Sequence, residues 1–292
     1  MSVDVSKALG KVISDKEFHF TNEICMLYAL AIGFNRDPLN EEEFKFTYEL
    51  DDDYTTFSTM AVLGITTFGY ELLQLPGFPP YDPSSLLHGE QILEIKQPVV
   101  PDTIARCVAT IEDVADKGKG TVLTIRLDIT DKDTQELLAI GYMRFFIKGL
   151  GGFGYKGTFA TNYSEIPDRT PDEIAECPTD KNQALIYRLC GDINSLHVDP
   201  NIASMVGFEA PILHGLCTYG IVARAIYTQY CDGDPSLIKS VNSRFTSHVY
   251  PGETIVVEMY KEGSKVIFSA KTKERELQVC IGFVEITGSS KL

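Results

Sequence analysis

One segment of the sequence places an acid, an amide and an imidazole within a few positions of one another. It spans 187–200 and contains Asp192, Asn194 and His197, with Asp192 and His197 five positions apart. Gly191 and Asn194 favour turns over a continuous helix, so a bend can bring the carboxylate and the imidazole to one point. There the two groups could share one water molecule, one taking a proton while the other supplies one, with Asn194 as a positioning donor and acceptor between them.

A second segment, 211–220, contains Gly215 directly before a long apolar stretch. That stretch has good helix formers and no proline, which predicts a helix beginning near Gly215. The Gly215 N–H would then be an unpaired donor at a helix N-terminus, suited to a carbonyl oxygen that gains negative charge. An acid–base pair with such a donor indicates chemistry at a carbon next to, or conjugated with, a thioester carbonyl.

Each of these residues also has a simpler structural reading. Asp192 and Asn194 could cap a helix that begins near Pro200, while His197 packs in a half-buried loop. Gly215 could merely let the chain turn into its helix. Residue types alone leave both alternatives open.

The two segments together resemble the signature of the MaoC-like, or type 2, 2-enoyl-CoA hydratases, whose form is GDxNPLHxDP followed by PILHGLC. Here the first motif reads Gly191-Asp-Ile-Asn-Ser-Leu-His-Val-Asp-Pro200 and the second Pro211-Ile-Leu-His-Gly-Leu-Cys217. The likeness extends over nearly the whole chain, through 87–91, 116–118, 151–154, 244–245 and 249–252, and is closest to the hydratase part of peroxisomal multifunctional enzyme type 2. Ser195 and His248 depart from it, since proline is common at both positions.

The resemblance implies reversible syn hydration of a trans-2-enoyl-CoA to a (3R)-3-hydroxyacyl-CoA in peroxisomal fatty-acid β-oxidation, with no metal and no cofactor besides the CoA of the substrate. It assigns Asp192 and His197 to the water, Gly215 to the thioester enolate and Asn194 to holding the geometry. The positions that match its substrate contacts are His88, Gly89, Lys117, Asp192, Ile193, Asn194, Ser195, Leu196, His197, Gly215 and Phe245.

Lys117 also has a physical argument for a phosphate contact. It stands beside Gly118, Lys119 and Gly120, which gives a local cluster of positive charge and free backbone N–H groups in an acidic chain. Taken alone, a Lys-Gly turn is usually the tip of a hairpin. His214 precedes the oxyanion glycine, and we expect it to orient the loop rather than to act as a catalyst.

Composition limits the function classes. With 292 residues, 44% of them hydrophobic, the chain is long enough for one large or two ordinary domains. A net charge of -15 argues against a nucleic-acid partner. The apolar runs fall short of the ~18 residues of a membrane span. The seven cysteines form no CxxC pair, so we expect buried thiols rather than a zinc site or disulfides.

The printed sequence ends in Ser290-Lys291-Leu292. This tripeptide is the address that peroxisomal import receptors read, so we expect such a receptor as a partner and the peroxisomal matrix as the location. A homodimer is also expected.

The second half repeats the plan of the first, which predicts two α+β halves that form a pseudo-dimer, the double hot-dog fold that the resemblance implies. We expect an N-terminal repeat at 1–150, a linker at 151–180 and a catalytic repeat at 181–289, followed by the targeting tripeptide at 290–292. The expected helices are 23–33, 56–75 and 215–230. Strands are expected at 88–96, 104–112, 122–130, 137–147, 255–260, 266–272 and 278–286, with a hairpin loop at 113–120. The first half has no acid–base pair, so we expect one active site per chain, with the first half supplying substrate contacts.

Two rival functions remain open at this point. An acyl-CoA thioesterase could share the fold and use a carboxylate to activate water against the thioester carbonyl. A non-catalytic acyl-CoA-binding protein would bind the ligand without changing it.

Overall fold

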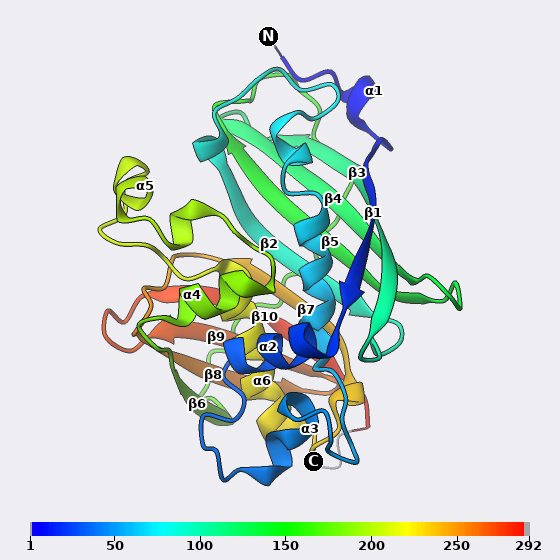
Figure 1. Ribbon diagram of the computed structural model, residues 1–292. Helices are drawn as coiled ribbons and strands as arrows, with labels where there is room; N and C mark the ends of the chain where they lie inside the picture. Colours follow the sequence, from blue (N-terminus) through cyan, green and yellow to red (C-terminus); the bar gives the residue numbers. More distant parts are fainter. Residues whose placement is uncertain (1, 289–292) are drawn as a thin grey trace.

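The computed structural model describes residues 2–288, and its strands form one ten-stranded antiparallel sheet (Figure 1). The strand order is β1-β3-β4-β5-β2-β7-β10-β9-β8-β6. The strands are β1 (Val12–Phe20), β2 (Leu86–Ile95), β3 (Thr103–Asp116), β4 (Gly120–Asp131), β5 (Leu137–Lys148), β6 (Glu173–Pro178), β7 (Ile238–Phe245), β8 (Thr254–Glu262), β9 (Lys265–Thr272) and β10 (Gln278–Ile286).

The sheet has the same order on both sides of its centre. Read outward from the central pair, the first half gives β2, β5, β4, β3 and β1, and the second gives β7, β10, β9, β8 and β6. The central pair is antiparallel, from Glu90 opposite Arg244 to Glu94 opposite Ser240. The predicted internal repeat and the double hot-dog fold are therefore confirmed, and the two halves meet along the β2–β7 seam.

Helices and single turns lie mainly on one side of this sheet, facing the viewer in Figure 1. The α-helices are α1 (Val5–Ala8), α2 (Asn22–Ala31), α3 (Phe44–Thr47), α4 (Gln183–Tyr187), α5 (Pro200–Met205) and α6 (Gly215–Tyr230). The 3-10 helices are η1 (Glu41–Glu43), η2 (Ser58–Thr67), η3 (Glu71–Leu73), η4 (Pro83–Ser85), η5 (Arg188–Cys190), η6 (Ser195–His197) and η7 (Pro235–Leu237). One hydrophobic core runs through both halves.

The strands of the second half wrap around helix α6, which begins at Gly215 as predicted. It contacts β6, β7, β8 and β10, and most of its side chains are buried. Helix α2 crosses it closely at Gly220, where a Cβ atom would lie 2.5 Å from Ile32 Cγ2. Glycine at this position therefore allows the close approach of the two helices.

The expected long helix at 56–75 is wrong in type and extent. The segment forms the 3-10 helix η2, which ends at Thr67 and contacts β1, β2 and β4. The backbone N–H groups of Met60 and Phe68 donate to carbonyls three residues back, those of Phe57 and Ile65, at 2.9 and 3.2 Å. This spacing matches the 3-10 turn rather than the α-turn.

The segment expected as a linker, 151–180, ends in a strand. β6 pairs with β8 from Glu173 opposite Met259 to Pro178 opposite Thr254, so it forms the outer edge of the second half. The preceding irregular part is tied to the sheet by Tyr163, whose hydroxyl donates to Glu90 at 2.5 Å. Glu90 also pairs with Arg144 of β5.

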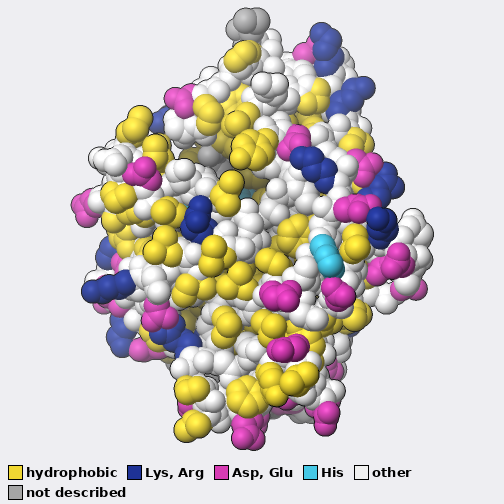
Figure 2. Space-filling view, in the orientation of Figure 1, with side chains coloured by type: hydrophobic (Ala, Val, Ile, Leu, Met, Phe, Trp, Pro, Cys, Tyr) yellow, Lys and Arg dark blue, Asp and Glu magenta, His cyan; other side chains and the backbone are white. Residues whose placement is uncertain are grey.

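Two features of the whole chain bear on its partners. Among the described residues, no helix has both the length and the apolar character that a bilayer span requires. Figure 2 shows basic side chains lying beside acidic ones on the face in view rather than gathering into one basic area. This mixture of signs on one face accompanies a net charge of -15 over the whole sequence.

Candidate active site

The bend at 191–197, which carries Asp192, Asn194 and His197 and is called the catalytic bend below, begins at Gly191, directly after η5. This glycine has a φ of 120°, and a Cβ atom there would lie 3.0 Å from Thr66 Cγ2 of η2. A side chain at this position would be strained and crowded, so glycine is required for the sharp turn into Asp192. The first half of the chain thus packs directly against the bend that carries the acid.

Asp192 and Asn194 hold the bend by hydrogen bonds to its own backbone. The Asp192 carboxylate accepts the Asn194 N–H at 3.1 Å, and Asn194 Oδ1 accepts the Leu196 N–H at 3.1 Å. Asn194 is thereby the N-cap of η6, the turn that ends at His197. It shapes the turn between the acid and the base, with its amide oxygen occupied by the capping bond. Helix α5 has its own cap, Asp199.

His197 is oriented by a backbone carbonyl. Its Nδ1 lies 2.8 Å from the Ile212 oxygen, and because a carbonyl can only accept, Nδ1 carries the proton. Nε2 therefore presents a lone pair. One oxygen of Asp192 and one ring nitrogen each of His197 and His214 lie within 4.8 Å of one another. A single water molecule can bridge a gap of this size between acid and imidazole.

The local electrostatics keep the imidazoles neutral. Burial lowers the pKa of His197 from 6.5, although the nearby charge of Asp192 acts in the opposite direction. Burial, aided by His197, lowers the pKa of His214 to about 2. At neutral pH, His197 can therefore accept a proton while Asp192 supplies the negative charge of the pair.

The backbone N–H of Gly215 is the hydrogen-bond donor of the site. Gly215 is the first residue of α6, its N-cap His214 makes no side-chain capping bond, and within residues 2–288 the Gly215 N–H has no hydrogen-bond partner. A Cβ atom at this position would lie 3.5 Å from the ring of Phe245. The N–H thus lies at a helix N-terminus beside an aromatic wall, where a developing oxyanion would be favoured.

The first half contributes the other wall through the start of β2. The ring of His88 lies 4.8 Å from Phe145 and 5.5 Å from Phe245, and burial among these groups lowers its pKa to about 4. The charge of Asp192 acts on the pKa of His88 in the opposite direction, raising it. Gly89 stands where the register of β2 and β5 shifts, and its Cα faces the Arg144 carbonyl.

The remaining expected contacts lie at the edge of this cluster. Ile193 and Ser195 are exposed and Leu196 is half-buried, all on the catalytic bend. Lys117 is at the tip of the β3–β4 hairpin. The loop between these strands is shorter than the predicted loop at 113–120, because β3 continues to Asp116.

Lys117 is separated from His88 by the width of the sheet between β2 and β4. His88 lies opposite Phe145, which lies opposite Leu123, so β4 is two strands or about 10 Å away at this level, and the hairpin tip lies further along, beyond Gly120. The hairpin tip projects beyond the end of the sheet at which β2 begins. The Asp116 carboxylate accepts the N–H groups of Gly118, Gly152 and Gly154, which fixes the tip to the glycine-rich loop. This placement suits a long ligand with a distant phosphate.

By residue type, Asp192, His197 and His214 could also hold a metal ion. The two rings, however, are stacked, with centroids 3.7 Å apart and planes 28° apart, and each ring has one nitrogen bonded to a carbonyl. One nitrogen of each ring therefore remains for another partner, whether a water molecule or an ion. The arrangement favours acid–base chemistry, and the expectation that no cofactor is required stays a prediction.

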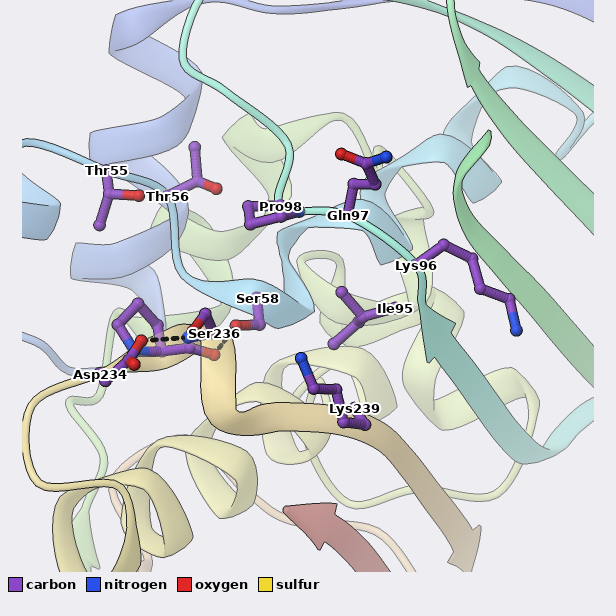
Figure 3. A pocket seen from close by; sticks show the side chains of 11 residues that line it. Thr55, Thr56, Ser58, Ile95, Lys96, Gln97, Pro98, Asp234, Ser236 and Lys239 are labelled. Atoms are coloured by element: carbon purple, nitrogen blue, oxygen red, sulfur yellow. Dashed lines mark hydrogen bonds between the residues drawn. The ribbon is translucent and has the colours of Figure 1, made fainter. Parts of the chain in front are cut away.

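A cavity of about 250 Å³ lies at the other end of the β2–β7 seam from the candidate site (Figure 3). It is bordered by the residues before η2, the end of β2 and the start of β7. In the internal repeat these correspond to the residues before α6, the end of β7 and the start of β2, which form the candidate site. Its lining contains no histidine, and its one carboxylate, that of Asp234, accepts the Ser236 N–H at 2.8 Å. This counterpart has no acid–base pair, which supports one active site per chain.

Sequence reasoning missed two contacts of the site. The Ile212 carbonyl that orients His197 has no side-chain signal, and the stacking of His214 on His197 depends on the tertiary structure. The only hint in the sequence was the position of His214 directly before Gly215.

The chain was compared with known proteins. The MaoC like domain family matches residues 162–280, and the MFE-2 hydratase 2 N-terminal domain family matches residues 18–149. A protein of Dictyostelium discoideum named probable enoyl-CoA hydratase 2 is 39% identical over 93% of this chain and 92% of its own length. The peroxisomal enoyl-CoA hydratase 2 of Arabidopsis thaliana is 38% identical over 97% of this chain and 95% of its own length.

A solved structure agrees with these relatives. The crystal structure of a MaoC-like dehydratase from Phytophthora capsici covers 99% of both chains, with a TM-score of 0.90 and 34% identity. Fold, motif positions and site geometry therefore lead to one assignment. The chain belongs to the MaoC-like enoyl-CoA hydratase 2 family.

Proposed function

We propose that this protein catalyses the reversible hydration of trans-2-enoyl-CoA to (3R)-3-hydroxyacyl-CoA. The observation that carries the proposal is the approach of the Asp192 carboxylate and the His197 ring to within 4.8 Å, beside the unpaired N–H of Gly215. Relatives with this activity in their names, at 38–39% identity over nearly the whole chain, support it.

The chemistry follows from the geometry. Asp192 and the lone pair of His197 bind one water molecule and polarise it as its oxygen bonds to C3 of the enoyl group. Electron density moves from the C2–C3 double bond to the thioester oxygen, which the Gly215 N–H stabilises as an enolate. C2 then takes a proton from the pair, so the net change is the addition of one water. Addition of both parts from the side that holds Asp192 and His197 gives the syn outcome.

The substrate contacts are proposed on the same geometry. His88 and Phe245 flank the reacting end, while Lys117 lies far enough away to meet a phosphate of CoA. The CoA part of the substrate thus extends toward the β3–β4 hairpin.

The test is a direct assay with crotonyl-CoA and longer enoyl-CoAs. Hydration removes the enoyl absorbance, and chiral analysis of the product should give the (3R) isomer. Release of free CoA, detected with a thiol dye, would instead indicate a thioesterase. Tight binding with no change in absorbance would indicate an acyl-CoA-binding protein.

Two finer proposals accompany this function. We place the protein in the peroxisomal matrix, acting in fatty-acid β-oxidation, because the Arabidopsis relative is named peroxisomal and the sequence contains Ser290-Lys-Leu292. The tripeptide lies outside the described residues. We also propose a homodimer, which sedimentation equilibrium would test by mass. Exposed large side chains support it, namely Leu185, Leu189, Ile193, Ile202, Met205 and Val206.

A further inference from the structure

His214 contacts, or adjoins in the chain, each of the three groups that the proposed hydration uses. We propose that His214 is a positioning residue: a neutral ring that holds the acid, the imidazole and the helix-tip donor in one geometry without itself transferring a proton. This inference rests on the proposed function and deepens it.

Three interactions link His214 to the reacting groups. Its Nε2 donates to the Asp192 carbonyl at 3.3 Å, and its ring stacks on that of His197 with centroids 3.7 Å apart. Its own carbonyl accepts the N–H groups of Cys217 and Thr218 at 3.1 and 3.2 Å, which fixes the first turn of α6. The aim of the Gly215 N–H therefore depends on the residue that also holds Asp192 and His197.

The surroundings of His214 restrict its movement. The side chain is 1% exposed, and the ring of Tyr187 packs against it at 4.9 Å between centroids. The preceding residue, Leu213, donates its N–H to the Val249 carbonyl at 2.8 Å, which fixes the backbone as well. A ring held in this way can transmit its position to the ring stacked on it.

The charge state of His214 suits positioning rather than proton transfer. The charged and titratable groups around it are Asp192, His197, Arg188 and Tyr187. Burial, together with His197 and Arg188, holds its pKa near 2, so the ring is neutral wherever the enzyme works. When His197 takes a proton, the cation forms against the face of an uncharged ring, which is a favourable contact.

Three substitutions separate the two contacts of this side chain. His214→Phe keeps a ring that can stack but loses the donor to Asp192. His214→Gln keeps a donor but loses the stack, and His214→Leu loses both. We expect kcat for crotonyl-CoA hydration to fall about 10- to 100-fold in His214→Leu, since misplacement of reacting groups by ~1 Å can cost that much. The losses in the Phe and Gln variants should be smaller, and KM should stay within about threefold.

A second measurement distinguishes positioning from general structural support. If His214 acts through His197, adding His214→Leu to His197→Gln should lower the rate by less than about threefold further. His19→Gln, a change at an exposed histidine of β1, serves as the control for handling and assay, and melting temperature is measured for every variant.

Each outcome decides the inference. A folded His214→Leu enzyme with kcat within twofold of the unchanged protein overturns it, as does a loss confined to KM or a fully multiplicative loss in the double variant. Failure of all three His214 variants to fold also overturns it, because the role is then structural. If the unchanged protein does not hydrate crotonyl-CoA, the proposed function itself fails, which is a different result.

Discussion

The Asp192 carboxylate and the His197 ring face one gap, and neither group can replace the other. Asp192→Asn removes the negative charge and His197→Gln removes the ring lone pair, with little change in side-chain size. Each should lower crotonyl-CoA hydration at least ~100-fold, as is typical of general acid–base groups. The measurement is the initial rate of loss of enoyl absorbance, with circular dichroism to verify folding.

The chain offers a matched control for this pair. His19 and Asp102 also form an Asp–His contact, at 2.7 Å, but on the exposed surface near the start of β3. His19→Gln and Asp102→Asn should leave the rate within about twofold, since surface pairs of this kind contribute little. Near-normal turnover in either site variant would remove the mechanism.

The sequence predicted the reacting residues because their types and spacing carry chemical meaning. Asp192, His197 and Gly215 were identified in this way, and the structure brings them together. The Ile212 carbonyl could not be identified, because every residue has a carbonyl and only the fold selects one. For Asn194 the sequence predicted a place between acid and base, and the structure specifies it as the cap of η6.

At the scale of elements, Gly215 is the first residue of α6, so a substitution can remove its N–H without breaking the helix. Proline is tolerated at the first helical position, where the N–H has no intrahelical partner. His214 has φ -58° and ψ 134°, a conformation that suits a residue before proline. Gly215→Pro should therefore keep the fold yet lower kcat about 100- to 1,000-fold, the usual cost of an oxyanion donor.

Gly215→Ala is the matched variant, since it keeps the N–H. Its Cβ atom would make an ordinary 3.5 Å contact with the Phe245 ring, so the helix and the donor should both survive. We expect it to retain most of the activity, with any loss mainly in KM. Comparable kcat losses in the alanine and proline variants would mean that space at Gly215, rather than its N–H, matters.

Elements were predicted best where they contain runs of buried apolar side chains. Strands β2, β3, β4, β5, β8, β9 and β10 were expected, whereas β1, β6 and β7 were not. β1 and β6 are edge strands with many exposed polar side chains, and β7 mixes Lys239, Asn242 and Arg244 with its apolar residues. Their pairing depends on neighbouring strands that a local pattern does not reveal.

At the scale of the whole molecule, buried neutral histidines make stability depend on pH. The folded pKa of His214 is about 2 and that of His88 about 4, against 6.5 for an unfolded histidine. Below pH 6.5 the unfolded chain therefore binds more protons than the folded one. Stability falls as the pH falls, by at most about 1.4 kcal/mol per pH unit for each of these histidines.

This pH dependence can be assigned to one residue. Urea unfolding at several values between pH 6.5 and 5 should show the free energy of unfolding decreasing with pH. In His214→Gln the slope should be shallower by about 1 kcal/mol per pH unit on average over this range, because one titrating group is gone. An unchanged slope in that variant would mean that His214 is not held neutral by the fold.

The repeat was the part of the global fold that the sequence could predict, because each half contains the same order of helix, turn and strands. The symmetrical strand order confirms it. The contact of η2 with the catalytic bend could not be predicted, since it joins Thr66 of one half to Gly191 of the other. One half therefore supplies the acid–base pair, and the other half supports it.

The last prediction concerns where the whole molecule acts. A fusion with a fluorescent protein before residues 1–292, built to end at Leu292, presents Ser290-Lys-Leu292 at its C-terminus, where import receptors read this tripeptide. We expect this fusion to gather in peroxisomes, marked by a second fluorescent peroxisomal protein, and the same fusion without those residues to stay diffuse. A fusion that carries Leu292→Asp keeps the length and should also stay diffuse. Peroxisomal accumulation of the shortened fusion would assign the address to another segment, whereas a diffuse full-length fusion would contradict the proposed location itself.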